Sequence, residues 1–514
     1  MEKRVLIAAL ISALFMAWYA QFVSKWYPQT PKPAQEAPGT APASTTISAK
    51  PATVYPLGEE DVVALKSQDL AVTIGKSSGA VRSVSLKRFL DQTGSRPLEI
   101  SNGLALTHLR SPASELTWRL TGERSGTAAF EAADSQGNNY YISYTIDSTK
   151  NLMSIVLEQV TGNEINLVLS SSWARGDELD QRKNPLEVYA LSMDEHGKEI
   201  HKRYIAHWRQ ERNVPRGTFL LSLTERYFCQ SIKFQTAPAE VKLIPSAEGT
   251  IVTEALINLQ AESGQAARQE ITIYFGPRDY FYLKRAGFER AFPIGALGQI
   301  GLILLSLLSW IAKLVRNYGV AIILFSGLIT CAMSPFTLLS FKSMRKMQEL
   351  KPQIDRIMAQ KKSDPAATNR EVFALYKQHR ISPLSGCLPM FLQMPIFIAL
   401  FQAITHFVEL RGQRFLWIKD LSLPDRLSHL PISLPILGKD LNLLPVIMAS
   451  AMYFQTKMSQ GKSNQGTQDP TAKMFSGPTM SIVFGVMFYQ FPSGLVLYWL
   501  TNSLMSLAWY RLAK

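Results

Sequence analysis

Cysteine is scarce in this sequence of 514 residues, which contains three: Cys229, Cys331 and Cys387. The odd number and the lack of any Cys-x-x-Cys pair exclude a disulfide framework and a metal site built on paired cysteines. Because two of the three lie in apolar runs, we expect all of them to be packed apolar thiols.

Histidine is also rare, and its spacing does not favour catalysis. His196 and His201 are five residues apart, which is not the helical pair of a zinc protease. With His108 and His207, they are expected to be solvated loop or edge residues. The sequence also contains no nucleophile motif. We therefore expect no enzyme activity, no cofactor, no metal site and no small-molecule substrate.

Acidic residues are fewer than basic ones, 40 against 54, which gives a net charge of +14. Such an excess fits either a nucleic-acid partner or a membrane surface. Its location favours the membrane: residues 342–380 hold ten positive and four negative charges, without the interleaved aromatics of a single-strand binder. The same segment could still contact ribosomal RNA.

The first half of the chain predicts one anchor, one linker and one all-β domain. Residues 1–27 combine a basic start with an apolar run long enough for a signal-anchor transmembrane helix. Residues 28–56 are rich in Pro, Ala, Ser and Thr and predict an extended linker. Residues 57–292 carry short β-branched and aromatic runs, such as 70–74, 140–146 and 271–275, which predict an antiparallel β-sandwich.

The second half predicts a membrane bundle. Five further spans are expected near 318–341, 388–408, 441–458, 474–489 and 494–510 of a core that covers 317–514. Residues 293–316 are also apolar, but their polar side chains share one face, so they predict an amphipathic helix at the membrane surface. The count is then six transmembrane helices with a five-helix core.

Charge fixes the expected orientation. The basic segment 342–380 predicts a helical hairpin broken near Asp364-Pro365, and it belongs in the cytoplasm. Both termini are then cytoplasmic and the β-sandwich is periplasmic, as in a multi-pass protein of a bacterial inner membrane. The expected docking residues for a ribosome or a substrate are Lys346, Lys351, Arg356, Lys361, Lys362, Arg370, Lys377 and Arg380.

Polar residues within the spans mark the candidate site. Ser326, Thr330, Ser334 and Thr337 follow one another at intervals of four, four and three, so they share a helical face. Two interpretations stay open: the face turns toward water or substrate, or the small hydroxyl residues permit close helix packing. The full candidate groove set is Ser326, Thr330, Ser334, Thr337, Gln393, Gln455, Tyr498, Trp499, Thr501 and Asn502.

Two long motifs carry a family resemblance. The segment 382–401, SPLSGCLPMFLQMPIFIALF, is similar to the third-span signature of the YidC type of membrane insertase. The segment 491–499, FPSGLVLYW, resembles the last-span signature, and Met333-Ser-Pro-Phe-Thr337 before a basic hairpin fits the second span. The resemblance covers the whole chain and indicates a Gram-negative bacterial member of the YidC/Oxa/Alb family.

The resemblance implies a membrane protein insertase and chaperone with a polar groove that opens to the cytoplasm and to lipid. Hydrophobic segments of nascent membrane proteins would pass through it into the inner membrane, alone or with the Sec translocon, and the ribosome and the lipid bilayer are further implied partners. One residue departs from the family pattern: Thr330 stands where members usually carry an arginine. This change puts electrostatic capture of acidic segments in doubt.

Two other functions remain open. A secondary transporter would show internal repeats, and none is visible between the second-to-third and fifth-to-sixth spans. A membrane-anchored sugar-binding or sugar-processing protein would act through the β-domain, where no matching acid–base pair is found. Solute flux would identify the first alternative, and deletion of about residues 57–290 would test the second.

Overall fold

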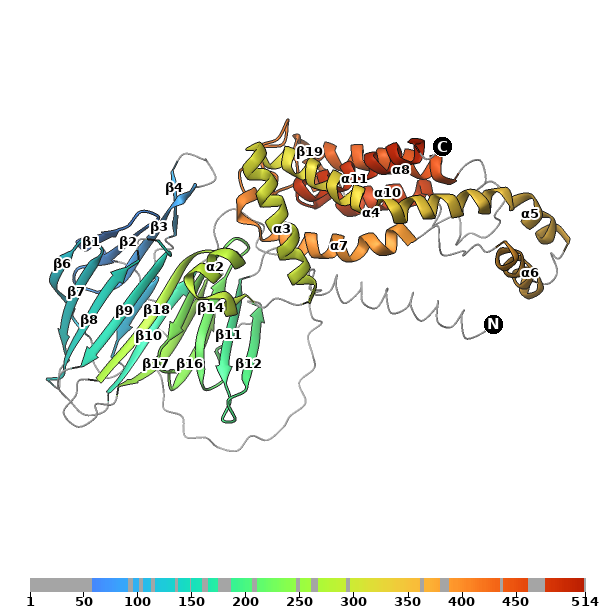
Figure 1. Cartoon of the computed structure of the whole chain (residues 1–514). Coiled ribbons are helices and arrows are strands. Elements are labelled where there is room, and N and C mark those ends of the chain that lie inside the picture. The colour runs from blue at the N-terminus through green and yellow to red at the C-terminus, as the bar shows by residue number, and fades with distance from the viewer. Residues whose placement is uncertain are drawn as a thin grey trace.

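The computed structural model describes residues 58–512, apart from 91–95, 101–104, 112–115, 135–136, 148, 160–164, 174–185, 206–209, 246–249, 260–266, 293–295, 361–364, 380–387, 435–437 and 461–476. An all-β domain and a bundle of helices lie side by side along the molecule (Figure 1). The predicted anchor and linker fall outside the described residues, so both remain predictions.

The β-domain consists of two antiparallel sheets, each with nine strands among the described residues. In spatial order the first contains β1 (Val62–Lys66), β2 (Leu70–Gly75), β3 (Val81–Leu90), β5 (Thr107–Arg110), β10 (Ile165–Trp173), β17 (Ile251–Leu259), β16 (Glu240–Pro245) and β13 (Arg212–Asn213), with β4 (Pro97–Ile100) beside β3. The second contains β12 (Glu199–Ile205), β11 (Glu187–Met193), β14 (Thr218–Thr224), β15 (Phe228–Phe234), β18 (Ala267–Pro277), β9 (Leu152–Gln159), β8 (Asn139–Ile146), β7 (Thr127–Ala133) and β6 (Arg119–Arg124).

Alternating burial explains why these runs form a sandwich. In β9, every second residue from Met153 onward is buried, because successive side chains point to opposite faces of a strand. Those side chains share one core with residues of the opposite sheet, including Leu169 of β10 and Ile257 of β17. The prediction of an all-β domain is confirmed.

One helix follows the last strand of the sandwich. Asp279 begins α2 (Tyr280–Ala286), because its carboxylate accepts hydrogen bonds from the backbone N–H groups of Phe281 and Tyr282. Gly287 ends the helix in the left-handed conformation, with φ at 78°. A short 3₁₀ turn, η2 (Glu289–Ala291), then packs against β11 and β14.

The helical half is built on α4, α7, α8, α10 and α11, which share one apolar core. Their bounds, with those of the neighbouring elements, are α3 (Ala296–Val315), α4 (Tyr318–Glu349), α5 (Lys351–Gln360), α6 (Pro365–Gln378), α7 (Leu388–Thr405), η4 (Val408–Leu410), β19 (Ser428–Leu434), β20 (Gly438–Leu441), α8 (Leu443–Gln460), α10 (Gly477–Met487), η6 (Phe488–Gln490) and α11 (Ser493–Leu512). Helix α11 packs between α4 and α8, and α10 covers α8.

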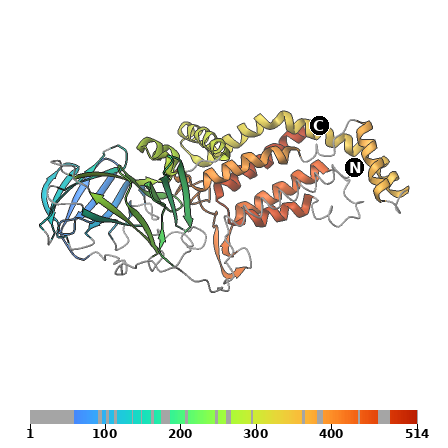
Figure 2. The ribbon, with the colours of Figure 1, turned by 90° about the horizontal axis from the view of Figure 1, so that it is seen from below.

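Helix α3 runs across the direction of the other helices, as both views show (Figures 1 and 2). It packs closely on α7, because a Cβ added at Gly301 would lie 2.9 Å from the Ala399 carbonyl oxygen. A crossing direction suits a helix in the plane of a membrane surface. The surface placement of residues 293–316 nevertheless stays a prediction.

Two helices among the described residues are long and apolar enough to cross a bilayer: Gly298–Val315 within α3 and Tyr318–Met347 within α4. Shorter apolar helices cover Gln393–Thr405 and Met480–Gln490. The predicted bundle of six transmembrane helices is therefore not confirmed and stays a prediction.

The basic hairpin is more continuous with the bundle than the sequence suggests. Helix α4 runs on to Glu349, past the expected end at 341, so its last turns form the first part of the predicted hairpin. Helices α5 and α6 complete the hairpin on either side of 361–364. The hairpin and the β-domain lie at opposite ends of the bundle (Figure 2), which is the arrangement that the predicted topology requires.

Candidate functional site

The hydroxyl groups on the polar face of α4 mostly form hydrogen bonds within their own helix. Ser326 and Thr330 are buried, and their hydroxyls donate to the carbonyl oxygens of Ile322 and Ser326, at 2.6 and 2.7 Å. Thr337, half-buried, donates in the same way to Met333 at 3.1 Å, and Ser334 is half-buried. Such bonds let small hydroxyl residues tolerate an apolar setting and close packing.

One of these hydroxyls also joins two helices. Thr330 Oγ1 lies 2.8 Å from Asn502 Oδ1, which connects α4 to α11. Thr330 is only 4% exposed. The position where the family resemblance implies an arginine is thus neutral, and its one hydroxyl proton is shared between the carbonyl oxygen of Ser326 and the amide oxygen of the half-buried Asn502.

A second polar pair connects α7 to α11. The amide nitrogen of Gln393 donates to the hydroxyl of Tyr498, and Tyr498 is buried. Thr501, on the next turn of α11, donates to the Leu497 carbonyl oxygen at 2.8 Å. Helix α11 therefore carries a partner for each of the other two helices, at Tyr498 for α7 and at Asn502 for α4.

Trp499 belongs to an aromatic cluster instead of a polar one. Its ring centroid lies 5.0 Å from that of Phe397 on α7 and 5.7 Å from that of Phe484 on α10. Phe488 stands 5.3 Å away and continues the cluster into η6. Trp499 therefore packs the apolar wall between α7 and α10.

The other candidate residues lie apart from these pairs. Gln455 is half-buried on α8, a helix that contributes to neither pair. The side chains of Lys346, Arg356, Arg370 and Lys377 are exposed on the hairpin, and Lys351 lies in α5. Lys361, Lys362 and Arg380 fall outside the described residues.

A polar network lies at the end of the bundle that contacts the β-domain, here called the outer end, and it had no signal in the sequence. Asp425 Oδ2 accepts hydrogen bonds from the backbone N–H groups of Leu443 and Leu444, both at 2.8 Å, and so caps α8 from a distant loop. Beside it, the Asn442 amide donates to the Tyr489 carbonyl oxygen at 2.7 Å. Such contacts join segments far apart in sequence, which no local pattern reveals.

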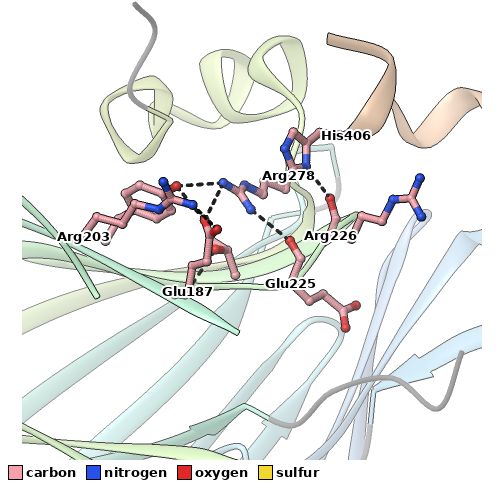
Figure 3. Close-up of polar contacts among 8 residues, drawn as sticks. Glu187, Arg203, Glu225, Arg226, Arg278 and His406 are labelled. Carbon is pink, nitrogen blue, oxygen red and sulfur yellow. Dashed lines mark hydrogen bonds and ion pairs between the residues drawn. The ribbon is translucent and has the colours of Figure 1, made fainter. Parts of the chain in front are cut away.

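A buried ionic cluster lies in the β-domain, shown in Figure 3. Glu187 contacts Arg203 and lies 3.0 Å from Arg278 Nη2, and it accepts a hydrogen bond from Tyr189 at 2.7 Å. Burial raises the pKa of Glu187, but the two guanidinium groups outweigh burial and lower that pKa to about 2. A permanently ionised carboxylate of this kind is a structural anchor and a poor proton acceptor.

Two expectations about rare residues need correction. His108 lies in the inner strand β5, where burial and the charge of Arg110 lower its pKa to about 4, so it is not a solvated edge residue. Cys331 is exposed on α4 and not packed, although Cys229 is buried as expected. His196 and His201, by contrast, lie in a turn and on an edge strand.

A family model and the curated relatives agree on one resemblance. Residues 310–512 match the family described as 60Kd inner membrane protein. A protein of Endomicrobium trichonymphae named membrane protein insertase YidC is 40% identical over 240 residues, which cover 46% of this chain and 44% of that protein. A protein of the same name from Chlorobaculum parvum is 26% identical over 516 residues, which cover 93% of this chain and 85% of that protein.

A solved structure entitled "Active YidC insertase crystal structure with the first transmembrane domain resolved" is 18% identical, covers 89% of this chain and 94% of its own, and gives a TM-score of 0.38. Against several of the curated relatives, the match spans about half of their length, 44% to 52%.

Proposed function

We propose that this chain, whose residues 310–512 match the family described as 60Kd inner membrane protein, is a membrane protein insertase. It would move hydrophobic segments of nascent proteins from the cytoplasm into the inner membrane, with no covalent step. Its relatives carry the name of that activity. The nascent chain and the lipid bilayer are the primary partners, and the Sec translocon and the ribosome are further ones.

The observation that carries the proposal is the pair of polar contacts on α11. Hydrocarbon offers no hydrogen-bond partner, so a polar segment of a substrate needs such groups at membrane depth. The Thr330–Asn502 and Gln393–Tyr498 pairs supply four polar side chains on three helices whose predicted spans contain no charged residue. Each pair can exchange its internal partner for a substrate group.

This arrangement favours polarity over charge as the source of binding. With Thr330 in place of the arginine, the site has no positive charge to attract an acidic segment. The hairpin at the opposite end from the β-domain supplies the positive surface, with Arg356, Arg370 and Lys377 exposed. We propose that a ribosome or an arriving nascent chain docks there.

The test is insertion into proteoliposomes that contain the purified protein. The substrate is a single-span protein with a short polar N-terminal segment, and protease protection measures insertion. Thr330→Val and Gln393→Leu remove a buried hydrogen-bond partner, so we expect about a tenfold loss of rate from each. Thr337→Val is the matched control, because the Thr337 hydroxyl donates to the Met333 carbonyl oxygen of its own helix.

Equal rates for all three variants would refute the role of the polar pairs. A crosslinker at position 330 gives an independent check: no adduct with a stalled substrate there, together with adducts elsewhere, contradicts a substrate path beside Thr330. A Thr330→Arg variant should improve insertion of acidic segments if the missing charge limits them.

A further inference from the structure

The turn between β14 and β15 reaches out of the sandwich and contacts the bundle. We name residues 225–228 the latch turn. Arg226 Nε donates to the Thr405 carbonyl oxygen at 3.1 Å, and Arg226 Nη2 donates to the Ser422 carbonyl oxygen at 2.9 Å. One guanidinium group of the β-domain thus holds two backbone positions of the helical half.

The first of these positions is the end of a helix. Thr405 is the last residue of α7, where carbonyl groups lack a partner within the helix. A cation at a helix C-terminus satisfies such a carbonyl and also matches the negative end of the helix dipole. Arg226 therefore caps α7 from another domain.

The second position leads to the start of α11. The carbonyl oxygens of Leu421 and Leu423, on either side of Ser422, accept hydrogen bonds from the backbone N–H groups of Gly494 and Ser493, both at 2.8 Å. Ser493 is the first residue of α11. Arg226 thereby ties the outer end of α7 to the outer end of α11, the two helices joined by the Gln393–Tyr498 contact.

The latch turn is itself held rigidly. Arg278 donates to the Glu225 carbonyl oxygen at 3.3 Å, and a ring nitrogen of His406 lies 3.1 Å from the Arg226 carbonyl oxygen, as Figure 3 shows. The buried Glu187 cluster fixes Arg278 in turn. A motion of the sandwich would therefore be transmitted to α7 and not absorbed in the turn.

Apolar packing crosses the same junction. Val408, just after α7, is 3% exposed and belongs to the apolar core of the β-sandwich. Tyr227 and Phe228 are also buried, and the guanidinium carbon of Arg226 lies 4.7 Å from the centre of the Tyr227 ring. Buried side chains from both halves therefore pack together at this junction.

We infer that Arg226 is a positioning residue through which the β-domain sets the spacing of the outer ends of α7 and α11. Its effect on insertion rests on the proposed function, whereas its effect on the two helix ends does not. The β-domain then acts as a brace for the polar pairs, although it lies outside the bundle.

The experiment is hydrogen exchange of the full chain in lipid nanodiscs, read by mass spectrometry. In Arg226→Ala, exchange in peptides covering 400–406 and 493–497 should rise about tenfold, because hydrogen bonds to a charged donor are lost. Exchange in β9 and β18 should not change. Arg226→Lys, which keeps the charge and can reach one carbonyl, should lie between wild type and Arg226→Ala.

Arg268→Ala is the matched control, since the ion pair that Arg268 makes with Glu158, at 3.6 Å, lies on the sandwich surface, and the variant should leave all peptides unchanged. Wild-type exchange at both helix ends in Arg226→Ala would overturn the inference, as would an equal rise in the sandwich strands. Unchanged insertion by Arg226→Ala, in a preparation whose wild type inserts, would overturn the positioning role. If the wild type itself inserts nothing, the proposed function is refuted. Hydrogen exchange alone then tests whether Arg226 holds the ends of α7 and α11.

Discussion

Replacing Glu187 by glutamine should lower the free energy of unfolding of the β-sandwich by about 3 kcal/mol at pH 7. The pKa of Glu187 falls from its ordinary 4.5 to about 2 in the folded protein, and each unit is worth about 1.4 kcal/mol of differential stability. Breaking a buried ion pair by removing one partner gives a similar figure, about 3–5 kcal/mol. The loss arises because Arg278, 7% exposed, keeps its charge without a counter-charge.

The pH dependence of this effect follows from the sign of the shift. A carboxyl group with a lowered pKa stabilises the folded state fully above its unfolded value and loses that contribution as the pH falls through the folded value. The difference between wild type and Glu187→Gln should therefore shrink as the pH falls from 4.5 toward 2.

Pulse proteolysis of the full chain in urea can measure this difference through the intact β-domain fragment. Glu158→Gln is the matched control, because its pair with Arg268 is exposed and should contribute about 1 kcal/mol or less. If Glu187→Gln destabilised the sandwich no more than Glu158→Gln, the buried cluster would not be a structural anchor.

Three further predictions concern single positions. Burial and the charge of Glu409 raise the pKa of Asp279 from 3.8 to about 6, so Asp279→Asn, which keeps the helix cap, should stabilise the sandwich at pH 8 by about 3 kcal/mol. That gain should vanish below pH 4, where wild type is protonated, and pulse proteolysis at both pH values checks it. Gly319→Ala should lower the stability of the bundle by about 1–2 kcal/mol in thermal unfolding, because its Cβ would lie 2.1 Å from the Phe415 ring. Gly301→Val should loosen α3 from α7, which increased proteolysis near α3 would reveal.

Local sequence patterns predicted most of the secondary structure. The runs 70–74 and 140–146 are strands β2 and β8, and the segment 271–275 lies within β18. Alternation of apolar and polar residues encodes such strands directly, because one face of each sheet is buried. The ends of helices were harder to predict from the sequence. Helix α4 continues eight residues past the expected end at 341, because the basic residues there extend the helix beyond its apolar stretch.

The polar face of α4 shows what residue spacing alone can predict and what it cannot. The sequence determined that Ser326, Thr330, Ser334 and Thr337 share a side, because helical periodicity fixes which residues align. It left open whether they serve packing or a groove. Only the structure shows that the Thr330 hydroxyl lies against Asn502, 172 residues away along the chain.

By itself, the sequence determined the elements of this protein: an all-β domain, a set of apolar helices and a basic hairpin, each encoded by residues close together in the chain. The tertiary structure alone decided the contacts that join them, including the Glu187–Arg278 pair, the Asp425 cap on α8 and the hydrogen bonds of Arg226 to the carbonyl oxygens of Thr405 and Ser422. Those contacts pair a side chain with a distant side chain or with a backbone N–H or carbonyl group, and nearly every residue has such backbone groups, so no residue pattern marks the partner.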